Sequence, residues 1–197
     1  MRLAPVALAA LAIFGIYKLY SGREIAHAPG VLVAEDPRQR VIESADVIDL
    51  GEFHLRPRAD FSATVRILRR EDYSLGALAK LVPTDFAVGW GPMSDSAVLS
   101  NIEISQGNRF YYWRTDHWPI DRADIERHSA NWHVIAANPG IGEVLGRLRA
   151  GTVVELRGRL VDIEGGESGM RTSLSRNDTG AGACEILLVE SATIAGS

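Results

Sequence analysis

The sequence lacks the cysteines that a disulfide framework or a cysteine-based zinc site requires. Its 197 residues include one cysteine, Cys184. A single thiol excludes an intramolecular disulfide, and it excludes a zinc centre built on several thiolates. Cysteine usage therefore does not indicate the redox compartment.

The sequence also lacks an excess of positive charge. It has 21 Lys and Arg against 25 Asp and Glu, a net charge of −4. The nearest approach to a basic cluster is Arg66, Arg69 and Arg70, which we interpret as the solvated end of a strand. This composition disfavours nucleic acid as a partner, because a polyanion is normally met by a concentrated basic surface. Internal repeats and low-complexity tracts are absent as well.

One long apolar run is present, over residues 3–17, and Lys18 follows it. With Leu19 and Tyr20 it approaches the length of about 20 residues that a spanning helix needs. We therefore predict a transmembrane anchor at residues 1–20. A cleaved signal peptide and a buried helix are the alternatives; the nearby A-x-A match, residues 26–28, precedes a proline.

The charges flanking the predicted anchor are nearly balanced, with Arg2 before it and Lys18 and Arg23 after it. We expect a single-pass protein of the inner (plasma) membrane with its globular domain in the periplasm. Residues 21–45, which contain Pro and Gly and show no sustained period, are predicted to be a tether. Residues 46–197 suffice for one hydrophobic core, so we predict a single β-rich domain there.

Alternating or continuous apolar patterns predict six or seven strands. They lie at residues 60–68, 84–90, 109–114, 132–137, 152–163, 170–175 and 184–189. In the fifth of these the alternation changes phase near Gly158, which predicts a β-bulge there.

Three short helices are expected among these strands. Ser94 is a candidate N-cap for the first, Asp121 for the second, and Asn138 followed by Pro139 for the third. The third helix should end before Gly151, which suits the C′ position. The element order predicts an α+β fold, either a small bent sheet or an OB-like barrel.

Four stretches carry more polar and aromatic residues than a core needs. They are the GWGPMSD turn at 89–95, residues 104–113 with Gln106 and Arg109, residues 128–133 with two histidines, and residues 173–185. These motifs resemble a family of uncharacterised bacterial membrane-anchored proteins, over about residues 60–190. The resemblance supports the architecture and implies no activity.

The aromatic strand at residues 110–113 is the strongest candidate for a recognition surface. Consecutive residues of a strand face opposite sides, so two of its four aromatic side chains should face the core and two should face outward, where a ligand or partner could bind them. The predicted ligand- or partner-binding residues come from this strand and the neighbouring motifs. They are Gln106, Asn108, Arg109, Tyr112, Trp113, His128, Asn131, His133, Arg176 and Asp178.

Several chemical interpretations of these residues compete. His128 and His133 could bind a metal together with Asp116, His117 or Asp121, but we favour a helix-capping His128 and a strand-embedded His133. The glycine-rich segment from Arg176 to Gly182 could cradle an anion, although a hairpin turn explains it as well.

Cys184 could be a nucleophile with His128 or His133 as its base. We favour a buried apolar role for this cysteine, because an apolar strand and Glu185 follow it.

The sequence therefore predicts a membrane-anchored binding or assembly module that presents an aromatic strand, with a protein as the expected partner and no cofactor. The alternative is a hydrolase-like enzyme that uses His128, His133, Arg176 and Asp178, with or without a divalent metal. A purely structural component is the third possibility.

Overall fold

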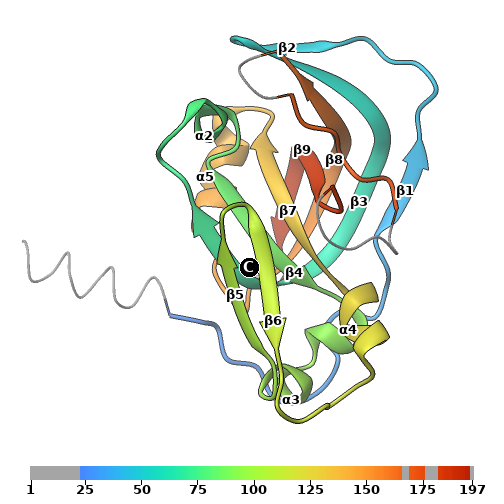
Figure 1. The fold of residues 1–197 in the computed structure, drawn as a ribbon, viewed down its shortest axis with the longest axis vertical. Coiled ribbons are helices and arrows are strands. Elements are labelled where there is room, and N and C mark those ends of the chain that lie inside the picture. Colours follow the sequence, from blue (N-terminus) through green and yellow to red (C-terminus); the bar gives the residue numbers. More distant parts are fainter. Residues whose placement is uncertain (1–22, 166–168, 176–181, 196–197) are drawn as a thin grey trace, which may run out of the picture.

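The computed structural model describes residues 23–165, 169–175 and 182–195 and has an α+β fold dominated by a bent sheet (Figure 1). The strands are β1 (Arg38–Val41), β2 (Ile48–Leu50), β3 (Phe53–Asp72), β4 (Thr84–Gly89), β5 (Glu103–Gly107), β6 (Phe110–Arg114), β7 (Ser129–Ala136), β8 (Val153–Glu164) and β9 (Glu185–Ile194). The helices are α2 (Ala77–Leu81), α3 (Ser96–Leu99), α4 (Arg122–Arg127) and α5 (Pro139–Arg147), with a 3-10 turn, η1 (Gly91–Ser94).

Seven strands form the main sheet, in the order β1-β3-β4-β7-β9-β8, with β2 paired to β3. β8 also pairs with β3 over most of its length. The β7–β9 pair is parallel, whereas the other pairs are antiparallel. β5 and β6 form a separate hairpin that lies in front of β4 and β7 in Figure 1.

The long strand β3 is the backbone of the sheet. Its 20 residues extend well beyond the predicted strand at 60–68 on both sides. Buried residues alternate with partly exposed ones from Phe53 to Val65, as expected for a strand with one face on the core. The largest core cluster includes Phe61, Val65, Phe86, Trp132 and Leu156.

The predicted bulge at Gly158 is confirmed. The pairing of β8 with β9 shifts register between Arg157 and Gly158. A Cβ atom at residue 158 would lie 1.9 Å from the Leu188 carbonyl oxygen, so only glycine lets the two backbones approach this closely.

The helix caps agree with the sequence in part. Asn138 caps α5 through a 3.1 Å bond from the Ile141 N–H to its side chain, as predicted. The Ser94 prediction is wrong: Asp95 caps α3, while Ser94 binds the backbone of Val33. Asp121 precedes α4, but its side chain makes no capping hydrogen bond.

The described residues form four short α-helices, where about three were predicted. The predicted strand at 170–175 is reduced to one isolated bridge between Ile163 and Met170.

The segment predicted as a tether contacts the domain over much of its length. Val33 is 4% exposed and belongs to the main core, and β1 pairs with β3. The Ile25 N–H donates to the Ala150 carbonyl at 2.9 Å, and His27 Nε2 lies 2.7 Å from the Gly151 carbonyl. We call residues 23–33 the N-terminal strap.

Arg66 lies under this strap, which corrects the interpretation of the basic trio. Its guanidinium is buried and donates to the Ser94 carbonyl, to Ser96 and to Glu24. Arg70 donates to three carbonyls at the end of α5. These two arginines stabilise helix ends and the strap, because guanidinium groups supply several fixed donors.

Among the described residues, no helix has the length and apolarity needed to cross a membrane. The predicted anchor at residues 1–20 lies outside the described residues.

Candidate functional site

The two faces of β7 differ: one face carries side chains of the main core, and the other carries polar side chains. Trp132 and Val134 point into the main core, whereas Ser129, Asn131 and His133 point toward the β5–β6 hairpin. The alternation follows from the two-residue period of a strand. Three polar side chains on a covered face are unusual, because each buried polar group needs a hydrogen-bond partner.

The hairpin that covers this face has a two-residue turn at Asn108 and Arg109. Both residues have positive φ, 53° and 69°. Two positive φ values are those of a type I′ turn, which suits the twist of a hairpin. Asparagine adopts this conformation readily, whereas arginine does so rarely. Contacts of Arg109 with the domain must therefore maintain it.

Arg109 fastens the tip of the hairpin to the sheet. Its Nη1 lies 2.9 Å from Oδ1 of Asp85, a residue of β4 that is fully buried. Its guanidinium carbon lies 3.6 Å from the centre of the Tyr73 ring, on which the group stacks. The backbone N–H of Arg109 donates to the Tyr73 hydroxyl at 3.0 Å. The Arg109–Asp85 ion pair holds the hairpin against β4. Because the pair is buried, removal of one partner would be strongly destabilising.

His133 shares the same carboxyl group. It stands opposite Asp85 in the β4–β7 register, and its Nδ1 lies 2.8 Å from Oδ1 of Asp85. The contact has the geometry of an ion pair rather than of a well-aligned hydrogen bond. Burial disfavours the charged ring, but contacts with Asp85 and Cys184 outweigh it and raise the pKa of His133 to about 9. His133 is therefore an imidazolium at neutral pH.

Asn131 connects the hairpin to the strand. The Gln106 side chain donates to its Oδ1 at 2.8 Å, and its Nδ2 donates to the Arg109 carbonyl at 3.2 Å. Three predicted site residues, Gln106, Arg109 and Asn131, therefore belong to one network, which His133 joins through Asp85, while Asn108 contributes the turn beside it.

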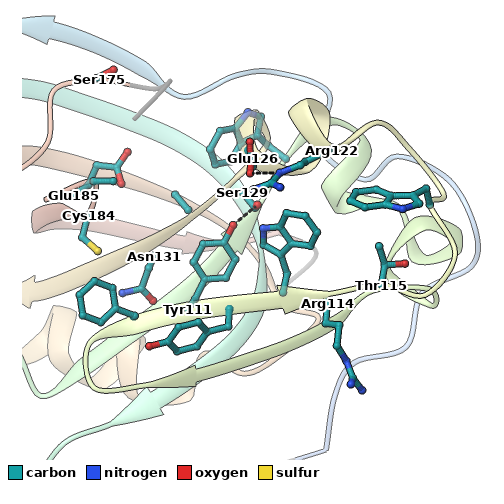
Figure 2. A pocket seen from close by; sticks show the side chains of 17 residues that line it. Tyr111, Arg114, Thr115, Arg122, Glu126, Ser129, Asn131, Ser175, Cys184 and Glu185 are labelled. Carbon is teal, nitrogen blue, oxygen red and sulfur yellow. Dashed lines mark hydrogen bonds and ion pairs between the residues drawn. The ribbon is translucent and has the colours of Figure 1, made fainter. Parts of the chain in front are cut away.

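A pocket of about 590 Å³ lies beside this network, between the hairpin and the start of β7. Its lining includes Tyr111, Trp113, Trp118, Ser129, Asn131 and Cys184. Figure 2 shows Cys184 and Glu185 at one end, Thr115 at the other, and Tyr111 and Ser129 between them. The volume is that of a typical small-molecule site.

Polar groups are placed at the middle of the pocket. The Tyr111 hydroxyl lies 2.7 Å from Ser129 Oγ, which donates to the Ile125 carbonyl at 2.6 Å. Burial raises the pKa of Tyr111, with support from Glu126, Glu185 and Cys184 and against the effect of the Ser129 hydrogen bond. The phenol is therefore neutral over the physiological range and available as a hydrogen-bonding group.

Aromatic rings form the far end of the pocket. Trp113 and Trp118 meet edge to face with centroids 5.9 Å apart, and the Arg122 guanidinium lies 5.8 Å from the Trp113 ring centre. Tyr112 also borders the pocket, but its side chain is largely exposed. On β6 the half-buried residues are thus Tyr111 and Trp113, which alternate with the exposed Phe110 and Tyr112.

His128 and His133 have different neighbours. His128 Nδ1 lies 2.8 Å from the Asp124 carbonyl at the end of α4, which confirms its capping role, and its ring packs against Trp90. His133 contacts Asp85 and Cys184. Within the described residues, no group of three or more His, Cys, Asp or Glu side chains is placed to hold a metal ion. Arg176 and Asp178 lie outside the described residues.

Cys184 is not the buried apolar residue that the sequence favours. It is half-buried, lines the pocket, and places its sulfur 3.9 Å from the Arg109 carbonyl oxygen. It also lies near enough to the His133 ring to contribute to the raised pKa of that histidine. Its neighbours are polar and charged because it precedes β9 at the level of Asn131, where the sheet face is polar.

Sequence reasoning missed Asp85, Tyr73 and Ser129. Asp85 offered a usable signal, since a carboxyl group in the otherwise apolar strand 84–90 must find a buried partner. Tyr73 and Ser129 offered none, because their role depends on where the hairpin folds.

Comparison of the chain with models of known families, with curated proteins and with solved structures gave no match.

Proposed function

We propose that this chain is a membrane-anchored binding module whose pocket holds a small ligand with a planar or ring-shaped group. The observation that carries the proposal is the convergence of Tyr111, Trp113 and Trp118 on one cavity whose floor is polar. Aromatic walls favour stacking on a flat group, and Ser129 and Asn131 supply orienting hydrogen bonds. Arg109 and Asp85 keep the covering hairpin in place.

The strand order supports an OB-like barrel as the architecture behind this pocket. The order β3-β4-β7-β9-β8 returns to β3 through the β3–β8 pairing, and α5 lies between β7 and β8. In OB folds the face of the second and third strands is the usual ligand face. β4 and β7 occupy those positions here, and the pocket borders β7. This support is analogy at the level of the fold.

Indole and phenol are suitable first probes of binding. We expect either one to change the tryptophan fluorescence of the full-length chain in detergent, with saturation. Trp113→Ala should abolish the effect, whereas Leu75→Ala, at an exposed apolar position outside the pocket lining, should leave it unchanged. Equal responses from both variants, or no saturable response to either probe, would contradict the proposal.

A protein partner is the second candidate. Tyr112 and Trp118 are 53% and 58% exposed at the border of the pocket, and large exposed aromatics are typical of interface centres. A Tyr112→Ala, Trp118→Ala double variant should lose any protein that co-purifies from detergent-solubilised membranes. Retention of that protein would place the interface elsewhere.

The membrane anchor and the periplasmic orientation are proposed from the sequence, on the apolar run at residues 3–17. The full chain should stay with membranes after a carbonate wash, and a reporter fused after Ser197 should be active outside the cytoplasm. Release by the wash would contradict the anchor, and reporter activity confined to the cytoplasm would contradict the orientation.

A further inference from the structure

We propose that Cys184 is a nucleophilic thiol that accepts acyl groups from esters held in the aromatic pocket, with His133 exchanging protons and Asp85 holding His133 in place. This inference rests on the binding function proposed above and names the substrate class. The hydrolase predicted from the sequence used His128, His133, Arg176 and Asp178; of these only His133 is kept here, and Cys184, for which the sequence favoured a buried apolar role, becomes the nucleophile.

Strand register brings the three side chains to one face. Asp85 of β4 is paired with His133 of β7 in an antiparallel ladder. On the other side of β7, His133 is paired with Ile186 of β9, and Cys184 lies two residues before Ile186. Residues two apart on a strand share a face, so the sulfur is on the same side as the imidazole.

The contacts have the order of a nucleophile, a base and an orienting group. The Cys184 thiol lies close enough to the His133 ring to influence its charge, and Nδ1 of that ring lies 2.8 Å from Oδ1 of Asp85. Asp85 is fully buried and His133 is 2% exposed, so both are held rigidly. Chains of this kind activate thiols and hydroxyls in unrelated folds.

The charges around the sulfur are those of a reactive thiol site. His133 is protonated at neutral pH, and a neighbouring imidazolium is a common feature of nucleophilic cysteines. Asp85, which contacts His133, is also paired with Arg109. Tyr111 and Glu185 are the other titratable groups near the thiol. A structural cysteine would instead be surrounded by apolar side chains.

The thiol is also placed where a ligand can reach it. Cys184 is half-buried and lines the same cavity as Tyr111 and Asn131, at the end marked in Figure 2. An ester whose ring lies against Trp113 would extend toward this end of the pocket.

The proposed reaction uses only the ester and water. The Cys184 thiolate bonds to the acyl carbon, the acyl carbon–oxygen bond breaks, and the departing alkoxide takes a proton from the His133 imidazolium to leave as the alcohol. Water then attacks the thioester, His133 takes a proton from it, and the carbon–sulfur bond breaks to release the carboxylic acid. The starting pair of thiolate and imidazolium is restored, and nothing is oxidised or reduced.

p-Nitrophenyl acetate is the probe for this step, applied to the full-length chain in detergent. Because the chain has one cysteine, any acetyl thioester found by mass spectrometry reports on Cys184 alone. We expect a burst of about one p-nitrophenol per chain, faster than acetylation of the same chain unfolded in urea. A burst no faster than in the unfolded chain would overturn the proposal.

Variants separate chemistry from folding. His133→Gln should slow the burst on the order of 100-fold, the usual size of a general acid–base contribution. His54→Gln, at an exposed histidine outside the pocket lining, should leave it unchanged. Asp85→Asn should alter the pH profile of the burst, which marks Asp85 as a positioning residue. Equal rates in the His133 and His54 variants would overturn the role of His133.

A measurement without substitutions covers the case in which the His133 variant fails to fold. Indole at ten times its dissociation constant should slow alkylation of Cys184 by iodoacetamide about 10-fold, by occupying the pocket. Binding of indole without protection would place the thiol outside the ligand site and overturn the inference while leaving the binding function intact. Rapid acetylation of Cys184 in a chain that binds neither indole nor phenol would contradict the binding function instead.

Discussion

At the scale of single residues, the site depends on one buried carboxyl group with two cationic partners. Asp85 is fully buried, and the same Oδ1 atom lies near both Arg109 and His133. A carboxyl group without such partners would be very unfavourable in this position. Asp85 thereby links the position of the hairpin to the charge of the histidine.

The raised pKa of His133 predicts a pH-dependent stability. A group with a folded-state pKa of about 9 and an unfolded value of 6.5 stabilises the fold fully below pH 6.5. This contribution is lost as the pH rises from 6.5 through 9. We expect the free energy of unfolding in urea to fall by on the order of 3 kcal/mol over this window. His133→Gln should flatten the profile, and a wild-type slope retained in that variant would contradict the assignment.

Removal of Arg109 should destabilise the protein strongly. Arg109→Ala leaves Asp85 with His133 alone, and we expect a loss of about 3 kcal/mol in the free energy of unfolding. Arg114→Ala removes the exposed Arg114–Glu103 pair of the same hairpin and should cost less than about 1 kcal/mol.

A double-mutant cycle tests whether the Arg109 effect is due to the ion pair. In an Asp85→Asn background the Arg109→Ala loss should be clearly smaller, since no charge is left unpaired. Equal losses in both backgrounds would show that Arg109 acts through its Tyr73 stacking instead.

At the scale of elements, β8 has a bulge at Gly158, where its backbone comes very close to that of Leu188 in β9. The bulge at Gly158 lets a single strand pair with β3 on one side and β9 on the other. β9 in turn begins at Glu185, directly after Cys184, and the register of β9 with β7 determines which residues Cys184 faces.

Gly158→Ala should therefore be disruptive. The added Cβ would meet the Leu188 carbonyl oxygen at 1.9 Å, and we expect a loss of about 2 to 4 kcal/mol in urea unfolding. Gly146→Ala in α5 adds a Cβ with nothing within 4 Å. That variant should be stabilising by about 0.5 to 1 kcal/mol, through helix propensity. Similar effects of the two substitutions would contradict this account of the bulge.

At the scale of the whole molecule, the N-terminal strap joins the folded domain to the predicted anchor. Val33 is buried in the main core, and the Gly91 N–H donates to its carbonyl at 2.7 Å. Gly91 begins the turn that follows β4, so the strap reaches the same end of β4 and β7 as the pocket.

Within the strap, the side chain of Val33 should contribute to stability and that of Val31 should not. Val33→Ala removes two buried methyl groups and should cost about 2 kcal/mol in the free energy of unfolding of the full chain. Val31, 52% exposed, is the matched control, and Val31→Ala should change stability by less than about 0.5 kcal/mol. A negligible effect at Val33 would show that the strap is not part of the core.

The sequence by itself determined the local features of this protein. Alternation and β-propensity predicted β4, β6, β7 and β8, the phase change predicted the bulge at Gly158, and Asn138-Pro139 predicted the start of α5. These features depend on residues close together in the chain. The sequence also indicated much of the polar network, because Gln106, Arg109 and Asn131 occur in dense motifs.

Only the tertiary structure decided which of those residues meet. The pairing of β4, β7 and β9 brings Asp85, His133 and Cys184 together from positions about 50 residues apart along the chain. The same pairing leaves His128 at a helix end. Pairing partners and strand register are set by the packing of the whole sheet, so no local pattern could have shown that Cys184 lies among charged groups.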